Sequence, residues 1–150
     1  MPVKNTLEYL KENFKQAEEA ANHLSVSVER CKNFINNSEF TEEQLIEIEA
    51  LTGRFARVSD LLIQKIFKTI DRLDGMTPHT VRDRIVQAEK KGLIGNANTF
   101  LQIRDVRNTI AHEYEDNEVR EIIDFVFNHS SFLIKSLEKA KEYSAKFYSN

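Results

Sequence analysis

The chain has 150 residues and a formal net charge of −3, with 41% hydrophobic and 30% charged residues. This length suits a single domain, residues 1–150, with a substantial core, and the composition excludes a chain that is disordered throughout. The negative charge argues against a general nucleic-acid binder that depends on bulk positive charge, and it leaves room only for a local basic patch.

The one cysteine, Cys31, excludes an internal disulfide and a cysteine-rich zinc site. Residues 1–13 carry several charged side chains and no apolar core, so we expect neither a signal peptide nor a membrane span there. The expected setting is reducing and cytoplasmic, with no membrane partner.

The first predicted element is a long amphipathic helix over residues 7–35. Its apolar positions recur three and four apart without interruption. They are Leu7, Leu10, Phe14, Ala17, Ala21, Leu24, Val28, Cys31 and Ile35. The polar segment 36–38 (Asn-Asn-Ser) ends this helix.

A second long helix follows, with apolar positions from Leu45 to Leu73. Thr41 and Gln44 have the spacing of a capping box at its start. Gly53 lies inside it and permits the close approach of another helix. Asp74 and Gly75 end the helix.

Two shorter helices and a last long one are predicted next. Thr77 and Pro78 open the third helix, because proline suits a first helical turn, and Gly92 and Gly95 close it. A fourth helix starts near Asn96, and a fifth follows residues 116–117 and runs through Ala140. No alternating β pattern competes, so the sequence predicts an all-α, up-and-down bundle of about five helices, three long and two shorter.

The fourth predicted helix carries residues 107–114, which read Arg-Asn-Thr-Ile-Ala-His-Glu-Tyr. An arginine is always charged and binds phosphate with a planar fork of donors, and a histidine exchanges protons near neutral pH. Such a pair can cleave a phosphodiester by activating a ribose 2′-hydroxyl, with no metal ion. Arg107 and His112 are therefore candidate catalytic residues, and Asn108 is a weaker candidate.

Helical geometry places demands on both residues. At about 100° per residue, Arg107 lies beside the apolar stripe defined by Phe100 and Ile103, so its charge needs an internal partner, a cleft or a bound anion. On a straight helix Arg107 and His112 point about 140° apart. They converge only if the helix loosens or if two subunits contribute, and we favour an isologous homodimer, which would also cover Leu101.

This motif resembles the Arg-x4-His-x-Tyr motif of HepT-like proteins, which belong to the HEPN superfamily of helical domains. The resemblance covers most of the chain and includes the Arg-Phe-Ala-Arg segment at residues 54–57. It implies a toxin of a two-gene toxin–antitoxin module, a dimeric, metal-independent ribonuclease partnered by a minimal nucleotidyltransferase. It also implies that Arg107 and His112 are catalytic, that Asn108 is the polar residue usual after the arginine, and that Tyr114 accepts an adenylyl group from the partner.

The same residues have structural interpretations. Arg107 can form a salt bridge to a neighbouring helix, and His112 can lie at a helix end without any catalytic role. Asn108 can hydrogen-bond to the main chain, and Tyr114 can be a core tyrosine with its hydroxyl at the rim.

A second group of charges lies near the motif in the expected fold. Arg54, Arg57, Arg104 and Asp60 form either a solvated charge network or a wall that contacts RNA phosphates, and the sequence does not separate these alternatives.

The remaining histidines and the basic pair at residues 90–91 are interpreted as structural. We expect His129 at the edge of the core, His23 and His79 at the surface, and the two lysines near the negative end of a helix dipole. The sequence contains no phosphate loop of the Walker type, no nucleophile elbow and no metal-ligand cluster, so we expect no metal and no cofactor.

Two functions follow from the sequence. The first is an RNA endonuclease acting as a dimer, favoured by Arg107, His112 and Tyr114. The second is a non-catalytic accessory or substrate-binding subunit of a minimal nucleotidyltransferase. The acidic net charge and the lack of an obvious RNA platform favour the second function.

Overall fold

The computed structural model describes residues 3–77, 80–111 and 116–149. Within these residues every regular element is helical, which confirms the predicted all-α bundle. In chain order the elements are α1 (Val3–Cys31), α2 (Glu42–Asp60), the π-helical segment η1 (Leu61–Ile66), α3 (Phe67–Leu73), α4 (Val81–Lys90), α5 (Ala97–Ala111), α6 (Asp116–Ser144) and a short final turn η2 (Ala145–Tyr148).

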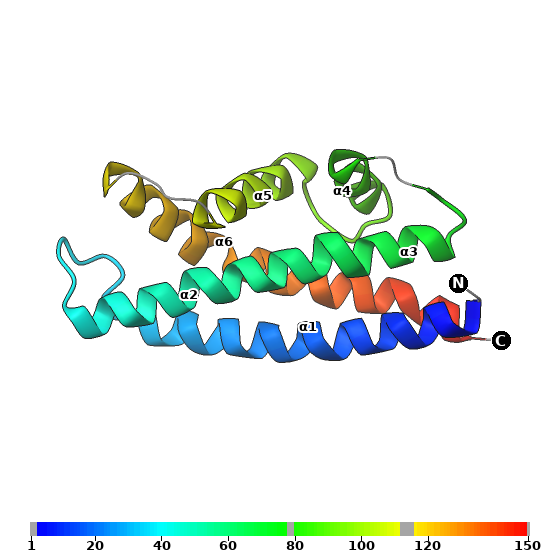
Figure 1. Ribbon diagram of the computed structural model, residues 1–150, viewed down its shortest axis with the longest axis horizontal. Helices are drawn as coiled ribbons and strands as arrows, with labels where there is room; N and C mark the ends of the chain where they lie inside the picture. Colours follow the sequence, from blue (N-terminus) through cyan, green and yellow to red (C-terminus); the bar gives the residue numbers. More distant parts are fainter. Residues whose placement is uncertain (1–2, 78–79, 112–115, 150) are drawn as a thin grey trace.

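The helices form two layers (Figure 1). α1 runs antiparallel to a continuous rod made of α2, η1 and α3, and α6 lies behind this pair. The shorter α4 and α5 cover the rod from the other side. The sequence predicted three long helices and two shorter ones. The three long helical units observed are α1, the rod and α6, and the two shorter helices are α4 and α5.

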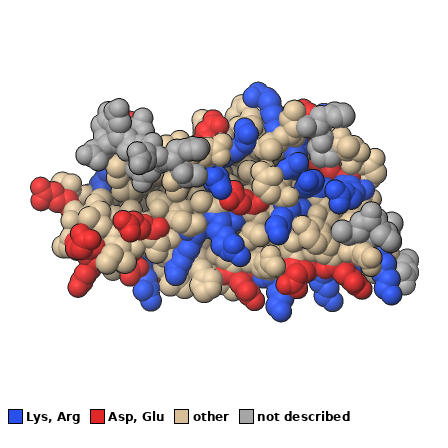
Figure 2. Space-filling model, viewed as in Figure 1, with Lys and Arg blue, Asp and Glu red and all other residues tan. Residues whose placement is uncertain are grey.

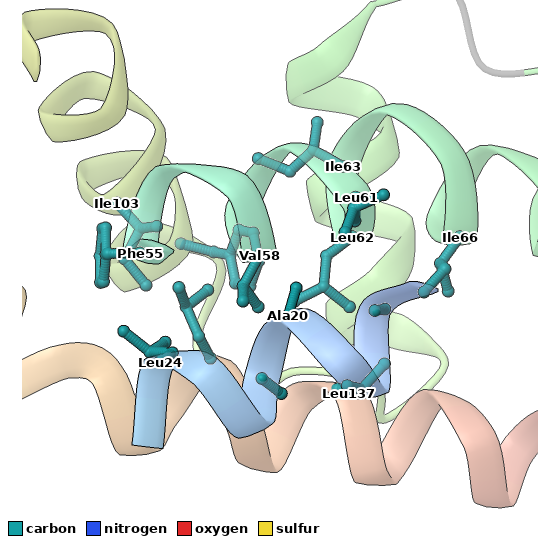
Figure 3. Packing of buried hydrophobic residues seen from close by; sticks show 14 of the residues in the cluster. Ala20, Leu24, Phe55, Val58, Leu61, Leu62, Ile63, Ile66, Ile103 and Leu137 are labelled. Carbon is teal, nitrogen blue, oxygen red and sulfur yellow. The ribbon is translucent and has the colours of Figure 1, made fainter. Parts of the chain in front are cut away.

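The core lies where α1, the rod and α6 meet, and α5 extends it. Figure 3 shows Phe55 of α2 facing Ile103 of α5, while Leu62 points toward α1. All three side chains are fully buried, and burial of each contributes about 1.5–3 kcal/mol to stability. The contact between Phe55 and Ile103 fixes α5 against α2. Arg107, one turn beyond Ile103, is thereby directed at the same helix.

The first helix ends earlier than predicted. α1 stops at Cys31, and the main-chain N–H groups of Phe34 and Ile35 both donate to the Cys31 carbonyl in a tight turn. Ile35 is nevertheless buried, because the turn keeps its side chain against the core. The apolar spacing therefore predicted burial correctly and the backbone conformation wrongly.

The start of α2 is as predicted. The Thr41 hydroxyl accepts a hydrogen bond from the N–H of Gln44, and the Gln44 side chain accepts one from the N–H of Thr41. This reciprocal pair satisfies two donors that a helix start leaves free. It fixes where the rod begins.

The rod itself differs from the single α-helix that was predicted. Over η1 the helix widens, so that the N–H of Phe67 donates to the carbonyl of Leu62, five residues earlier. Leu61, Leu62 and Ile63 are all buried although they follow one another in sequence. Figure 3 shows Leu62 directed toward α1 and Ile63 directed away from it. A π turn of this kind is rare and recurs near functional sites.

The predicted start of the next helix was wrong. α4 begins at Val81, and its cap is Thr80, whose hydroxyl accepts from the N–H of Asp83 at 3.0 Å. Pro78 lies outside the described residues. Thr80 has the extended backbone of an N-cap residue, with φ −133° and ψ 164°, and its hydroxyl satisfies a helix donor that would otherwise be free.

The end of α4 and the start of α5 agree with the sequence. Gly92, which follows the C-cap residue Lys91, has φ 77°, the left-handed conformation that glycine adopts at helix ends. Asn96 accepts from the N–H of Thr99 at the start of α5. Within the described part of the chain, no helix is both long and apolar enough to cross a membrane.

Candidate functional site

The centre of the candidate site is an ion pair between α5 and α2. Nε and Nη2 of Arg107 donate to Oδ1 and Oδ2 of Asp60 at 2.6 and 2.8 Å. The Arg107 side chain is 31% exposed and that of Asp60 39%, so the pair is at the surface. The hydrogen bonds to Asp60 raise the pKa of Arg107 above its ordinary value, and the guanidinium stays charged.

The sequence of α5 explains this position. Phe100 and Ile103 are fully buried, and the Phe100 ring packs against Phe67 and Phe132 with centroid distances of 5.4 and 6.2 Å. These contacts anchor the first half of α5. Arg107 follows in the second half, where the helix face changes from buried to partly exposed.

Two further arginines flank the ion pair. Arg104 precedes Arg107 by one helical turn, and Arg57 precedes Asp60 by one turn, so each lies beside its neighbour on the helix surface. In the described structure neither Arg57 nor Arg104 has a hydrogen-bond or ion-pair partner. We call Arg57, Asp60, Arg104 and Arg107 the α2/α5 charge cluster.

Arg54, which the sequence grouped with these residues, has another position. Its Nη1 donates to the Ser27 hydroxyl at 2.8 Å and to the His23 carbonyl at 3.1 Å, both on α1. Arg54 therefore ties α2 to α1. Asp60 pairs with Arg107, so the proposed network of Arg54, Arg57, Arg104 and Asp60 does not form as an ion-pair network in the described residues.

Two shallow grooves follow the seam between α1 and α2 and share Gln16 and Arg57. The first, of about 470 Å³, extends from Gly53 past Asp60 to Lys65. The second, of about 340 Å³, continues toward Arg54 and His23. A side chain added at Gly53 would meet nothing within 4 Å, so the expectation of a close helix approach there was wrong, and Gly53 instead leaves the groove open.

The surface over this region is basic. Figure 2 shows Lys and Arg side chains gathered over the middle of α2, whereas Asp and Glu gather at the end of the molecule where α2 begins. A negatively charged protein therefore carries a local group of basic side chains over the middle of α2, the helix that bears Arg57 and Asp60. Such a patch attracts anionic groups over a short range in physiological salt.

The structure describes only part of the rest of the motif. Asn108 is exposed on α5. His112 and Tyr114 lie outside the described residues. Leu101, which the sequence assigned to a dimer contact, already packs partly buried against the core of its own chain.

The other histidines are placed as expected where they are described. His129 is partly buried, its ring stacks on that of Phe125 at 3.9 Å, and Nδ1 lies 2.8 Å from the Phe125 carbonyl. His23 is exposed, and His79 lies outside the described residues. Lys90 is exposed as well.

Lys91 has a role that the sequence did not predict. Its ammonium pairs with Asp71 and Asp74 at the end of α3, and its side chain is 9% exposed. Lys91 therefore links the end of α4 to α3 and is withdrawn from any contact with RNA. Within residues 3–77, 80–111 and 116–149, no group of three or more His, Cys, Asp or Glu side chains is placed to hold a metal ion.

The main residue missed as a partner of the motif is Asp60. It lies 47 residues from Arg107 in the chain, so no local spacing connects the two. One sign of this pairing was present in the sequence: Arg107 lies beside an apolar stripe, so its charge required a partner. The sequence did not identify which residue that partner is. Asp60 provides that anion from α2.

Comparison with known proteins supplies the family. No curated protein matches this sequence. The profile of the family described as nucleotidyltransferase substrate binding protein like matches residues 12–143, which extend from α1 to α6 and include the α2/α5 charge cluster and the motif. The chain belongs to the nucleotidyltransferase substrate binding protein-like family.

Proposed function

We propose that this protein is the toxin of a toxin–antitoxin pair, a metal-independent endoribonuclease that acts as a homodimer beside a minimal nucleotidyltransferase. The observation that carries the proposal is Arg107. It is held near the surface by Asp60, has Arg104 one helical turn away on α5, and begins the Arg-x4-His-x-Tyr motif. The family description, which links the chain to nucleotidyltransferases, supports the partner.

The proposed chemistry needs only two side chains. His112 removes the proton of a ribose 2′-hydroxyl, and the 2′-oxygen bonds to the adjacent phosphorus. Arg107 stabilises the charge that develops on the phosphorane oxygens. The bond from phosphorus to the 5′-oxygen breaks, the 5′-oxygen takes up a proton, and a 2′,3′-cyclic phosphate remains until it is hydrolysed.

Homodimerisation brings these groups together. α5 is a regular α-helix from Ala97 to Ala111, so it does not loosen between Arg107 and the residue before His112. Residues five apart on an α-helix point about 140° apart, so a straight continuation of α5 would keep Arg107 and His112 of one chain apart. In the proposed dimer His112 of one protomer meets the partner's Arg107 across the twofold axis.

Control by the partner acts on Tyr114. The nucleotidyltransferase transfers AMP from ATP, with magnesium, to the Tyr114 hydroxyl and releases pyrophosphate. The new phosphate is negatively charged and pairs with the free donors of Arg107 or Arg104. It thereby occupies the position of an RNA phosphate and silences the enzyme.

The test is RNA cleavage by purified protein in EDTA, with products assayed for 2′,3′-cyclic phosphate. Arg107→Ala and His112→Ala should each abolish cleavage, whereas Arg72→Ala, an exposed arginine on α3, should not. Cleavage that survives both changes places the active site elsewhere. No cleavage by the unmodified wild-type protein contradicts the ribonuclease proposal.

Mixing the two inactive variants tests the dimer. If each site takes Arg107 from one chain and His112 from the other, half of the dimers in an equimolar mixture carry one intact site. About a quarter of the wild-type rate should then return. No recovery, with subunit exchange verified by native mass spectrometry, means that both residues act within one chain.

A second function is favoured by the family description itself. In this alternative the protein is a non-catalytic subunit that binds a nucleotidyltransferase and presents substrate to it. The net charge of −3 and the grooves between α1 and α2 fit that role. Intact-mass analysis after co-expression with the partner separates the two functions, because only the toxin is expected to gain an adenylyl group on Tyr114.

A further inference from the structure

Asp60 binds only one edge of the Arg107 guanidinium. The carboxylate receives Nε–H and one Nη2–H in a side-on, bidentate pair. The end-on edge, formed by Nη1 and the second Nη2 hydrogen, has no partner among the described residues. That edge is itself a fork matched to two oxygens of a phosphate. The guanidinium can therefore bind a phosphate without releasing Asp60.

The position of Asp60 is fixed by its neighbours. It is the last residue of α2, and Val58, Ser59 and Leu61 around it are buried. An aspartate side chain is short, so a fixed main chain fixes its carboxylate closely. The widened turn of η1 starts at the next residue.

This anchoring distinguishes Arg107 from the other arginines of the α2/α5 charge cluster. Arg57 and Arg104 have no partner in the described structure, and an unpaired arginine loses side-chain entropy when a ligand immobilises it. Arg107 is already held in place before any ligand arrives. A group placed in advance lowers the cost of reaching a transition state.

We infer that Asp60 is a positioning residue that holds Arg107 side-on and presents its Nη1–Nη2 edge to the scissile phosphate of RNA. This inference rests on the proposed ribonuclease function. It contrasts with a competing role, in which Asp60 would occupy Arg107 and weaken phosphate binding. The geometry favours positioning, because the end-on edge of Arg107 has no partner in the described part of the chain while the pair with Asp60 is intact.

Steady-state cleavage of RNA in EDTA separates the two roles. With Asp60→Asn, kcat should fall about 10- to 100-fold while KM changes little. The reason is that the Arg107 guanidinium would no longer be held in place, and a displacement of a catalytic group by about 1 Å can cost about 100-fold in rate. Asp60→Glu should recover part of kcat. An unchanged or higher kcat with Asp60→Asn, with or without a lower KM, would overturn the inference.

Asp105→Asn is the matched control. Asp105 is an exposed carboxylate on α5 that follows Arg104 in the sequence, and its removal changes the charge of α5's surroundings by the same amount. It should leave kcat unchanged. An equal fall in kcat for both variants would show that charge alone is responsible. A surface ion pair contributes little to stability, so Asp60→Asn should remain folded, which circular dichroism verifies.

A direct measurement distinguishes failure of this inference from failure of the proposed function. The Arg107 side-chain signals are followed by ¹⁵N NMR while a short, non-cleavable 2′-O-methyl RNA is added. The Nη signals should shift, and the Nε–H signal should stay protected by Asp60. Such shifts without cleavage of ordinary RNA would overturn only the ribonuclease function. Loss of Nε–H protection, or no Arg107 shift at all, would overturn the positioning role.

Discussion

Nη1 of Arg84, on α4, donates a 2.8 Å hydrogen bond to the main-chain carbonyl of Ile63 inside the π-helical segment η1. Arg84 is 8% exposed. Burial lowers its pKa, and the nearby Asp71 carboxylate acts in the opposite direction. Where a helix widens, main-chain carbonyls move away from their α-helical donors. Arg84 supplies a donor at that point and couples the docking of α4 to the register of the rod.

Replacing Arg84 with methionine should therefore destabilise the protein. The change removes the donor to the Ile63 carbonyl and leaves the buried Asp71 with less compensating charge. We expect a loss of about 2–4 kcal/mol in the free energy of unfolding by urea. Arg82→Met, on the exposed face of the same helix, should cost less than about 0.5 kcal/mol. Equal effects of the two changes would contradict the coupling.

Cys31 should react slowly in the native protein. Burial, and then the charge of Glu47, raises the pKa of its thiol to about 11. The ordinary value is about 8.5, so native labelling by a thiol reagent at pH 8 should be at least about 100-fold slower than in urea. The neutral thiol also stabilises the fold fully below about pH 8.5, and this contribution is lost as pH rises toward 11. Rapid native labelling would show that the site opens easily.

Local chemistry in the sequence predicted local structure well. Thr41 and Gln44 form the capping box because both partners lie within one turn. Gly92 ends α4 because glycine accepts the left-handed conformation. The spacing of apolar residues also identified the buried positions, and Ile35 is buried even though its backbone is not helical. These features depend on neighbours in the chain.

Features that depend on residues far apart in the chain were harder to predict from the sequence. The pairing of Arg107 with Asp60 joins α5 to α2, and the sequence required an anion without naming it. The widening of the rod at η1 depends on helices that surround Leu61 to Ile63 on several sides, which periodicity alone does not record. Lys91 pairs with Asp71 and Asp74 across a turn, and helix-dipole reasoning missed this.

The corrected start of α4 gives a test of helix capping. Thr80→Ala removes the acceptor for the Asp83 N–H and should cost about 1 kcal/mol of stability. Thr80→Ser keeps the hydroxyl and should cost less. Thr77→Ala should have little effect, since the helix begins at Val81. Thermal unfolding of the three variants measures these losses of stability. A larger loss for Thr77→Ala than for Thr80→Ala would show that the helix begins at Thr77, as the sequence predicted.

Asp74 should make the stability of the bundle depend on pH. It joins the end of α3 to α4 and α6, because it accepts from the Tyr143 hydroxyl at 2.6 Å and pairs with Lys91 at 3.0 Å and Lys146 at 3.1 Å. Burial alone would raise the pKa of Asp74. The hydrogen bonds from Tyr143 and both lysines outweigh burial and lower it overall.

A carboxyl group whose pKa is lower in the folded state stabilises the protein above its unfolded pKa of about 3.9. That contribution disappears as pH falls through the folded value. Urea unfolding of wild type should therefore weaken from pH 5 to pH 3 more steeply than unfolding of Asp74→Asn, and Tyr143→Phe should cost about 1 kcal/mol at pH 7. Asp105→Asn, which removes an exposed carboxylate, should keep the wild-type slope. A slope unchanged by Asp74→Asn would mean that other carboxylates control the acid limb.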